Sequence, residues 1–228
     1  MGINCIGMNG HNQELFNEYI CGRSIAVVGP AAYVTMFNHE DYIESFDIIM
    51  RFNDVLPIHE DMVKHIGSRV DILCNGLDGK PHSCGIYKVD LWIDNNVKWV
   101  FCPYAAQLPF QKLCVKNFLN HNNQRINTFI SPLADCKLIC DAMETRPNTG
   151  LLGLMYLLNN AAKEIFLTGF SFGVGGYSHH KGYKSKYNVT GPSRLHNQPM
   201  QHAYMKEIYK NHRHVIKVDN HLHGILTS

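Results

Sequence analysis

The chain has 228 residues, 45% of them hydrophobic, and a formal net charge of +2 at pH 7. This length fits one large α/β domain or two small ones, and we expect one. So small a net charge gives no support to a nucleic-acid-binding protein or to attachment to an anionic membrane.

The chain opens with a polar segment, residues 1–22, which we interpret as a lead-in that carries a short helix over residues 13–19. This segment contains no apolar core of the length that a signal peptide or a membrane anchor needs. The remainder, residues 23–228, is expected to form one domain. Without an export signal, the eight cysteines are expected to be reduced thiols in a cytoplasmic protein.

Short apolar runs alternate with helical and polar segments along the rest of the chain. The apolar run 151–158 is too short to span a membrane and suits a buried helix capped by Asn148 or Thr149. Residues 65–69 and 171–199 lack an apolar period and predict loops. In chain order, we expect strands over residues 24–28, 46–51, 70–74, 97–102, 126–130, 164–170 and 214–218, and further helices over residues 39–45, 110–120 and 200–211.

This alternation predicts an α/β fold, a Rossmann-like, mostly parallel sheet with helices on both faces. In such sheets, ligands bind beyond the carboxyl ends of the strands. The turn at Gly29 and Pro30 and the end of the next strand at Asn53 should lie on one edge, which we interpret as a nucleotide site. A helix that begins at Thr149 adds backbone amides suited to phosphate. The turn lacks the further glycines of a dinucleotide-binding fingerprint, and the sequence has no P-loop.

Three separated segments, taken together, carry the most specific signal in the sequence. Residues 24–69 contain AVVG, SFDIIMRFN and GSR in that order. Residues 147–170 contain PNTGLLGLMYLL and then EIFLTGF, and His202 is followed five residues later by Glu207. This order and spacing resembles the eukaryotic-type sialyltransferases, family 29 of the glycosyltransferases, whose large, small and very short motifs the three segments match.

The resemblance implies a single glycosyltransferase domain of the variant, GT-A-like sialyltransferase fold. It implies an inverting, metal-independent transfer of sialic acid from CMP-sialic acid to a hydroxyl of a glycoprotein, glycolipid or oligosaccharide, with the CMP-sugar as co-substrate and no cofactor. His202 takes the place of the general base, and His179 or His180 that of the group that assists the departing phosphate. The residues that it places at the nucleotide are Gly29, Pro30, Asn53, Asn148, Thr149, Gly150, Gly169, Phe170 and Ser171.

The chemistry of such a transfer explains why these residue types are needed. An acceptor hydroxyl is a poor nucleophile until its proton is removed, and an imidazole with an ordinary pKa of about 6.5 accepts that proton at neutral pH. A departing monophosphate needs hydrogen-bond donors, which a helix N-terminus and a loop histidine supply. No carboxylate cluster shaped for a catalytic metal is evident in the sequence.

The sequence departs from the family pattern at three positions. Pro30 stands where the family usually has Asn, so one hydrogen bond to the nucleotide is lost or replaced. Ser24 and Ala161 stand at the positions of the family's disulfide, so both partners are absent together. The missing disulfide and the missing anchor fit a reducing compartment and suggest a viral or microbial source.

Two other functions stay open on the sequence alone. A protein of the same fold could transfer Kdo or another CMP-linked ulosonic acid. It could also be a non-catalytic module that binds a nucleotide or a glycan. The departure at Pro30 leaves the transfer of another ulosonic acid open. The presence of His202 and of Thr149 with Gly150 argues against a non-catalytic module.

Several other conspicuous side chains are expected to be structural. Cys136 and Cys140 are predicted to be buried thiols on one helical face. Arg51 and Arg69 are interpreted as structural ion-pair partners. The C-terminal histidines lie on or beside a strand and lack a nearby cysteine pair, so we do not expect them to bind zinc; they are His212, His214, His221 and His223.

Overall fold

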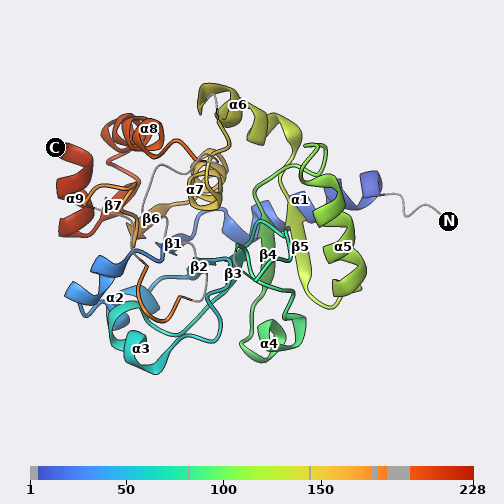
Figure 1. Cartoon of the computed structure of the whole chain (residues 1–228), viewed down its shortest axis with the longest axis horizontal. Helices are drawn as coiled ribbons and strands as arrows, with labels where there is room; N and C mark the ends of the chain where they lie inside the picture. The colour runs from blue at the N-terminus through green and yellow to red at the C-terminus, as the bar shows by residue number, and fades with distance from the viewer. Residues whose placement is uncertain (1–4, 82, 144, 176–178, 184–195) are drawn as a thin grey trace.

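Strand β1 (Ser24–Val28) lies inside a sheet of parallel strands. The computed structural model of the chain describes residues 5–81, 83–143, 145–175, 179–183 and 196–228. Besides β1, the sheet contains β2 (Ile48–Phe52), β3 (Ile72–Cys74), β4 (Trp99–Cys102), β5 (Asn127–Ile130), β6 (Glu164–Thr168) and β7 (Ile216–Val218). Their order across the sheet is β5-β4-β3-β2-β1-β6-β7 (Figure 1).

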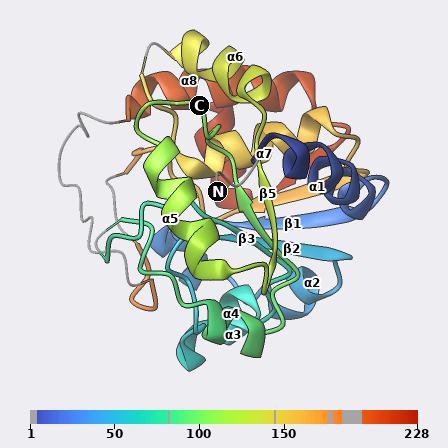
Figure 2. The same ribbon diagram turned by 90° about the vertical axis from the view of Figure 1, so that its right-hand side faces the viewer.

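Helices connect the strands and cover both faces of the sheet. They are α1 (Cys5–Ile20), the 3-10 helix η1 (Ala32–Met36), α2 (Glu40–Glu44), α3 (Glu60–Ile66), α4 (Val89–Asp94), α5 (Lys112–Asn122), α6 (Leu133–Met143), α7 (Thr149–Asn159), α8 (Gln198–Asn211) and α9 (Asn220–Thr227). Figure 2 shows α6, α7 and α8 on one side of the sheet and α2 and α3 on the other.

Alternate residues of each strand supply two hydrophobic layers, one on each face of the sheet. In β1, Ile25 and Val27 belong to the larger layer, which includes α1 and α7. Ala26 and Val28 belong to the smaller layer, which includes η1, α2 and α3. A strand that is buried on both faces reads as a continuous apolar run, and β1 has the bounds that the sequence predicts. The seven expected strands are all present, and the predicted α/β fold is confirmed.

Helix α1 is longer than the helix expected over residues 13–19, and its side chains enter the core. Phe16 is fully buried, and its ring stacks on Phe129 with 4.7 Å between the ring centroids. It also meets Trp99 edge-on at 5.2 Å. The Asn12 side chain donates a hydrogen bond to the Thr128 carbonyl. These contacts fix α1 against β4 and β5.

Three short helices, α3, α4 and α9, lie where no helix is expected from the sequence. The loop expected over residues 65–69 is wrong at its start, because α3 continues to Ile66. The Nδ1 atom of His59 caps this helix by accepting a hydrogen bond from the Asp61 amide at 3.3 Å. His221 and His223 lie on α9 and not on or beside a strand, which corrects their expected placement.

The cysteines are not joined in disulfides among the described residues, and Ser24 and Ala161 occupy the two positions of the family's disulfide. The seven cysteines whose side chains are described are free. Cys136 and Cys140 share one face of α6 with 3.7 Å between their sulfur atoms, as expected, although Cys140 is only half-buried. The Ser24 hydroxyl donates to the Asp47 carboxylate at 2.8 Å, and Ala161 has a left-handed backbone with φ of 60°.

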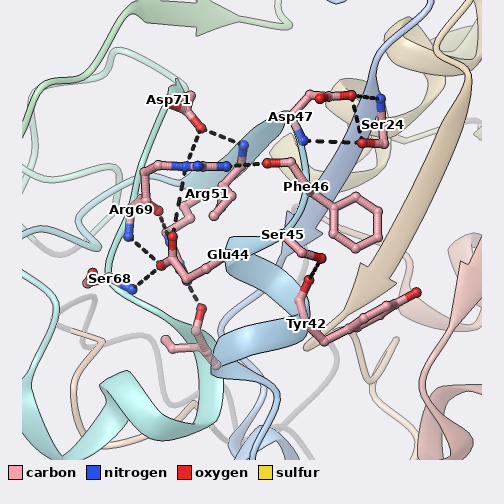
Figure 3. A network of polar contacts seen from close by, with 12 residues as sticks. Ser24, Tyr42, Glu44, Ser45, Phe46, Asp47, Arg51, Ser68, Arg69 and Asp71 are labelled. Carbon is pink, nitrogen blue, oxygen red and sulfur yellow. Dashed lines mark hydrogen bonds and ion pairs between the residues drawn. The ribbon is translucent and has the colours of Figure 1, made fainter.

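Arg51 and Arg69 belong to one network of polar contacts at the ends of β2 and α3 (Figure 3). Arg69 is an ion-pair partner, as expected, with its Nε atom 3.0 Å from the Asp71 carboxylate. Arg51 is fully buried, and its guanidinium donates to the carbonyl oxygens of Arg69 and Ile66. Among the described residues Arg51 forms no ion pair, which corrects the role expected from the sequence.

Candidate active site at the switch point of the sheet

The strand order reverses direction at β1, which pairs with β2 on one edge and with β6 on the other. This is a topological switch point, and in open parallel sheets ligands bind in the crevice outside the carboxyl ends of the strands at such a point. Gly29 follows β1 and Gly169 follows β6, so both glycines lie at the expected edge.

The two glycines approach each other more closely than any other residue type would allow. A Cβ atom on Gly29 would lie 2.3 Å from the Gly169 carbonyl oxygen, and one on Gly169 would lie 2.2 Å from the Gly29 oxygen. Gly169 also has a φ of +77°, which disfavours a side chain. The amide of Ala31 donates to the Gly169 carbonyl at 2.9 Å. The intervening Pro30 has no amide hydrogen, and its carbonyl accepts from His180.

Phe170 links this glycine pair to the start of α7. A Cβ atom on Gly150 would lie 2.5 Å from the Phe170 ring, and one on Gly29 would lie 2.9 Å from it. The ring meets Phe52 edge-on with 5.6 Å between the centroids. Phe170 is only 9% exposed, so its ring is buried between the turn at Gly29 and the start of α7. The next residue, Ser171, is half-buried.

The N-terminus of α7 is fixed by two amide side chains, those of the half-buried Asn148 and the buried Gln201. Asn148 is the N-cap, and its Oδ1 atom accepts from the Leu151 amide at 2.8 Å. The backbone amide of Asn148 donates to Oε1 of Gln201, a fully buried residue of α8, at 3.0 Å. Thr149 and Gly150, the first residues of the helix, are buried. A helix start held in this way presents its positive dipole end to the edge of the sheet.

Asn53 joins the ends of β2 and β3. Its φ of 50° lies in the left-handed region, which Asn tolerates better than most residues. Its amide donates to the Cys74 carbonyl at 2.9 Å, and its Oδ1 atom accepts from the Gly76 amide at 3.2 Å. Asn53 is therefore placed beside Phe52, whose ring contacts Phe170.

His202 lies on α8, one residue after Gln201. Its Nε2 atom is 2.8 Å from the Ile225 carbonyl oxygen. Because a carbonyl only accepts hydrogen bonds, Nε2 carries the hydrogen, and Nδ1 is the basic nitrogen of the ring. The ring stacks on Phe172 with 6.2 Å between the centroids, and Phe172 stacks on Phe170 at 6.1 Å. A row of aromatic rings thus connects His202 with the switch point.

His179 and His180 belong to a short strap, residues 179–183, that crosses the end of β1. His179 forms an isolated antiparallel bridge with Ala31, and the amide of His180 donates to the Pro30 carbonyl at 2.9 Å. His180 is buried, and burial together with the nearby His179 and Arg51 lowers its pKa to about 4. Its ring is therefore neutral at pH 7. Residues 176–178 and 184–195 of the expected loop lie outside the described residues.

Tyr33 and Asp219 also shape this edge, although nothing in the sequence singles them out. The Tyr33 hydroxyl accepts from the amides of Gly169 at 2.8 Å and Phe170 at 3.2 Å. It donates to the Asp219 carboxylate at 3.1 Å, which also accepts from the Thr168 hydroxyl at 2.6 Å. Burial, and then the charge of Asp219, raise the pKa of Tyr33. The network fixes the two amides that follow β6.

A Tyr33→Phe variant is expected to lose about 2–3 kcal/mol of unfolding free energy, because it leaves two buried amides without an acceptor. Urea unfolding of the purified protein measures this loss. The matched control is Tyr42→Phe at a ring that is 46% exposed, where a change within about 0.5 kcal/mol is expected. Equal stability of Tyr33→Phe and wild-type protein would contradict the network.

Arg146 is a further residue at the site that has no signal in the sequence. Its guanidinium lies over the ring faces of Tyr104 at 4.3 Å and Phe110 at 4.2 Å. It stands two residues before the cap of α7 and, among the described residues, forms no ion pair. The start of α7 therefore carries a full positive charge beside its dipole.

Solved structures of sialyltransferases are similar to this architecture. No protein-family model and no curated protein matches the sequence. A mammalian sialyltransferase in complex with Gal-beta-1-3GalNAc-ortho-nitrophenol matches with a TM-score of 0.58 and 16% identity, over 90% of this chain and 72% of that one. The Campylobacter jejuni sialyltransferase CstII matches with a TM-score of 0.59 and 13% identity, over 86% and 81%. The monofunctional alpha-2,3-sialyltransferase Cst-I of the same organism matches with a TM-score of 0.58 and 15% identity, over 86% and 75%.

The chain has the sialyltransferase fold. The resemblance predicted from three short segments is thus confirmed at the level of architecture. Of the predicted residues, Gly29 and Gly169 lie against each other at the ends of β1 and β6, and the ring of Phe170 lies between Gly29 and Gly150 at the start of α7. In the described ranges, no group of three or more His, Cys, Asp or Glu side chains is arranged to hold a metal ion. None of the described helices is long and apolar enough to cross a membrane.

Proposed function

We propose that this protein is a glycosyltransferase that moves sialic acid from CMP-sialic acid to a glycan hydroxyl, with inversion and without a metal. The observation that carries the proposal is the convergence of two glycine turns and a helix N-terminus at the switch point of a sialyltransferase fold. Similar structures support it, because their ligands include cytidine-5'-monophosphate, CMP-3FNeuAc and a Gal-beta-1-3GalNAc glycoside.

In this proposal the nucleotide lies over the turns at Gly29 and Gly169, whose lack of side chains lets a ligand approach the backbone. The departing phosphate lies at the start of α7, where Thr149 and Gly150 begin the helix. The charge of Arg146 stabilises the negative charge that builds up on that phosphate. Asn53, which follows β2, also contacts the nucleotide in this proposal.

The acceptor hydroxyl has to lose its proton as it attacks the anomeric carbon. We assign this proton to Nδ1 of His202, because Nε2 already donates to the Ile225 carbonyl. The same bond holds the ring in one tautomer and one orientation, as a general base requires. His179 or His180 assists the departing phosphate. His180 is neutral in its buried position, so it would act there as a hydrogen-bond donor.

The experiment that tests the proposal is a thermal-shift panel with CMP, CDP, UMP, UDP, GDP and AMP, each with and without EDTA. A ligand that binds only the folded state at about 100 times its Kd adds roughly 2.7 kcal/mol of stability. We expect CMP to raise the Tm selectively and EDTA to leave that rise unchanged. Stabilisation by UDP or GDP that needs a metal would contradict the proposed donor. No shift with any nucleotide would favour a non-catalytic module.

A further inference from the structure

Cys136 and Cys140 are a pair of thiols on α6 that the proposed transfer does not use. Their sulfur atoms lie 3.7 Å apart, within hydrogen-bond distance, because the two residues are four positions apart on one helical face. Cys136 is only 1% exposed, whereas Cys140 is half-buried. One sulfur atom is therefore enclosed by the protein, and its partner can be reached from solvent.

The surroundings of the pair favour a thiolate. Cys136 is the fourth residue of α6 and lies in its first turn, where the helix dipole stabilises a negative charge. A hydrogen bond from the Cys140 thiol lowers the pKa of Cys136, and the Ala105 amide adds to this effect. Arg146 also favours the thiolate, whereas burial and Asp135 oppose it. Because the two sulfur atoms share a proton, loss of one proton leaves a charge that either of them can carry.

The helix holds the two sulfur atoms close together, but a bond between them requires the helix to adjust. Four residues of α-helix rise about 6 Å, which is within the Cα separation of about 4.4–6.8 Å that disulfides span. The Cβ atoms at this spacing lie about 5–6 Å apart, whereas a disulfide brings them to about 3.5–4.5 Å. One turn of α6 therefore has to tighten. Helix α6 lies at the periphery of the fold (Figure 2), and its Leu138 is 70% exposed, so this turn has room to move.

Cys136 also contacts the segment that supports the start of α7. Its partner Ala105 follows Tyr104, whose ring lies under the Arg146 guanidinium at 4.3 Å. The Tyr104 hydroxyl donates to the Pro147 carbonyl at 2.8 Å. Arg146 and Pro147 are the two residues that precede the N-cap of α7. A movement of the Cys136 sulfur is therefore transmitted through Ala105 and Tyr104 toward the start of this helix.

We propose that Cys136 and Cys140 are a redox modification site, which a small-molecule disulfide such as glutathione disulfide oxidises reversibly to a disulfide within α6. The more exposed Cys140 thiolate attacks one sulfur of glutathione disulfide, and one glutathione thiolate leaves. The Cys136 thiolate then attacks Sγ of Cys140, and the second glutathione thiolate leaves. The two cysteines lose two electrons and two protons, and glutathione disulfide gains them and becomes two thiols. The tightened turn strains the new bond, so it is easily reduced, as regulatory disulfides are.

The test incubates the full, reduced chain with glutathione disulfide, alkylates the remaining thiols and maps the peptides by mass spectrometry. Trypsin cleaves after Lys137, between the two cysteines, so the disulfide joins two peptides that are otherwise separate. We expect this joined pair to form, to escape alkylation and to separate again after treatment with dithiothreitol. Hydrogen exchange of α6 amides should be at least about tenfold faster in the oxidised protein, because the tightened turn weakens the helix.

Two variants separate the roles of the thiols. Cys136→Ser lacks the second nucleophile, so a glutathione adduct should accumulate at Cys140. In Cys140→Ser, the enclosed Cys136 should react with glutathione disulfide at least about tenfold more slowly than Cys140 does. The control is Cys114→Ser, at a half-buried thiol that donates to the Phe110 carbonyl, and it should form the wild-type disulfide. Wild-type protein that stops at a Cys140 adduct, full alkylation of both thiols after oxidation, or unchanged exchange in α6 would overturn the proposal. None of these measurements uses CMP, so failure of the proposed function gives a different result.

Discussion

Replacement of His202 by alanine is expected to lower the rate of sialyl transfer by about 10²–10⁴-fold, the range for a lost general base. The reason is structural: Nε2 of His202 is committed to the Ile225 carbonyl, so Nδ1 is its basic nitrogen. The measurement is the release of CMP from CMP-sialic acid in the presence of a glycan acceptor. The Tm rise with CMP should be retained, because His202 is assigned to the acceptor and not to the nucleotide.

A second substitution separates loss of the base from loss of the hydrogen bond to α9. His202→Gln can still donate to the Ile225 carbonyl but has no basic nitrogen, and we expect it to be as inactive as His202→Ala. The matched control is His223→Ala, at a histidine of α9 whose Nδ1 atom lies 2.9 Å from the Tyr209 hydroxyl. Donor turnover at the wild-type rate in His202→Gln would show that another group removes the proton.

Gly169→Ala is expected to give the largest loss of stability, about 4 kcal/mol or more. The new methyl group would lie 2.2 Å from the Gly29 carbonyl oxygen, which is backbone and cannot move aside without separating β1 from β6. The φ of +77° adds a strain of about 1–2 kcal/mol for an L-residue. Urea unfolding measures the loss, and absence of soluble folded protein agrees with it.

The chain offers a matched control for this prediction. Gly175 has a φ of +75°, and no atom of the described residues lies within 4 Å of the place that a Cβ atom would take, so Gly175→Ala carries the strain without the clash. We expect Gly175→Ala to lose only about 1–2 kcal/mol. The difference in unfolding free energy between the two variants measures the cost of the clash between the two glycine turns. Equal losses would mean that Gly169 is required for its backbone conformation alone.

The features that the sequence predicts well are those whose signal is local. Strand β1 is an apolar run between Ser24 and Gly29, and its bounds agree with the structure. The cap of α7 at Asn148 precedes a helix that is apolar on all sides, so its start is marked in the sequence. The short helix α9 has Leu222, Ile225 and Leu226 at helical spacing, but its eight residues are fewer than the window of about 11–18 residues over which such a period is read.

The contacts that complete the site join residues far apart in the chain, and no spacing rule predicts them. Tyr33 and Asp219 are separated by 186 residues, and Asn148 and Gln201 by 53. Arg51 resembles an ordinary ion-pair residue in the sequence, and only the positions of Asp71 and Glu44 show that its charge is not paired. Charge and residue type are local properties, whereas the partner of a buried group is a property of the fold.

The pairing of β1 with β6 has a consequence for the biosynthesis of the protein. Ser24 pairs with Glu164 and Val28 with Thr168, so one edge of the first strand has no partner until β6 has been synthesised. At about 5–20 residues per second, this interval lasts roughly 7–28 s. An apolar strand with unpaired backbone groups is prone to associate with other chains during that time. Nascent chains of this protein are therefore expected to depend on chaperones, and the two glycine turns come together only after Gly169 has been synthesised.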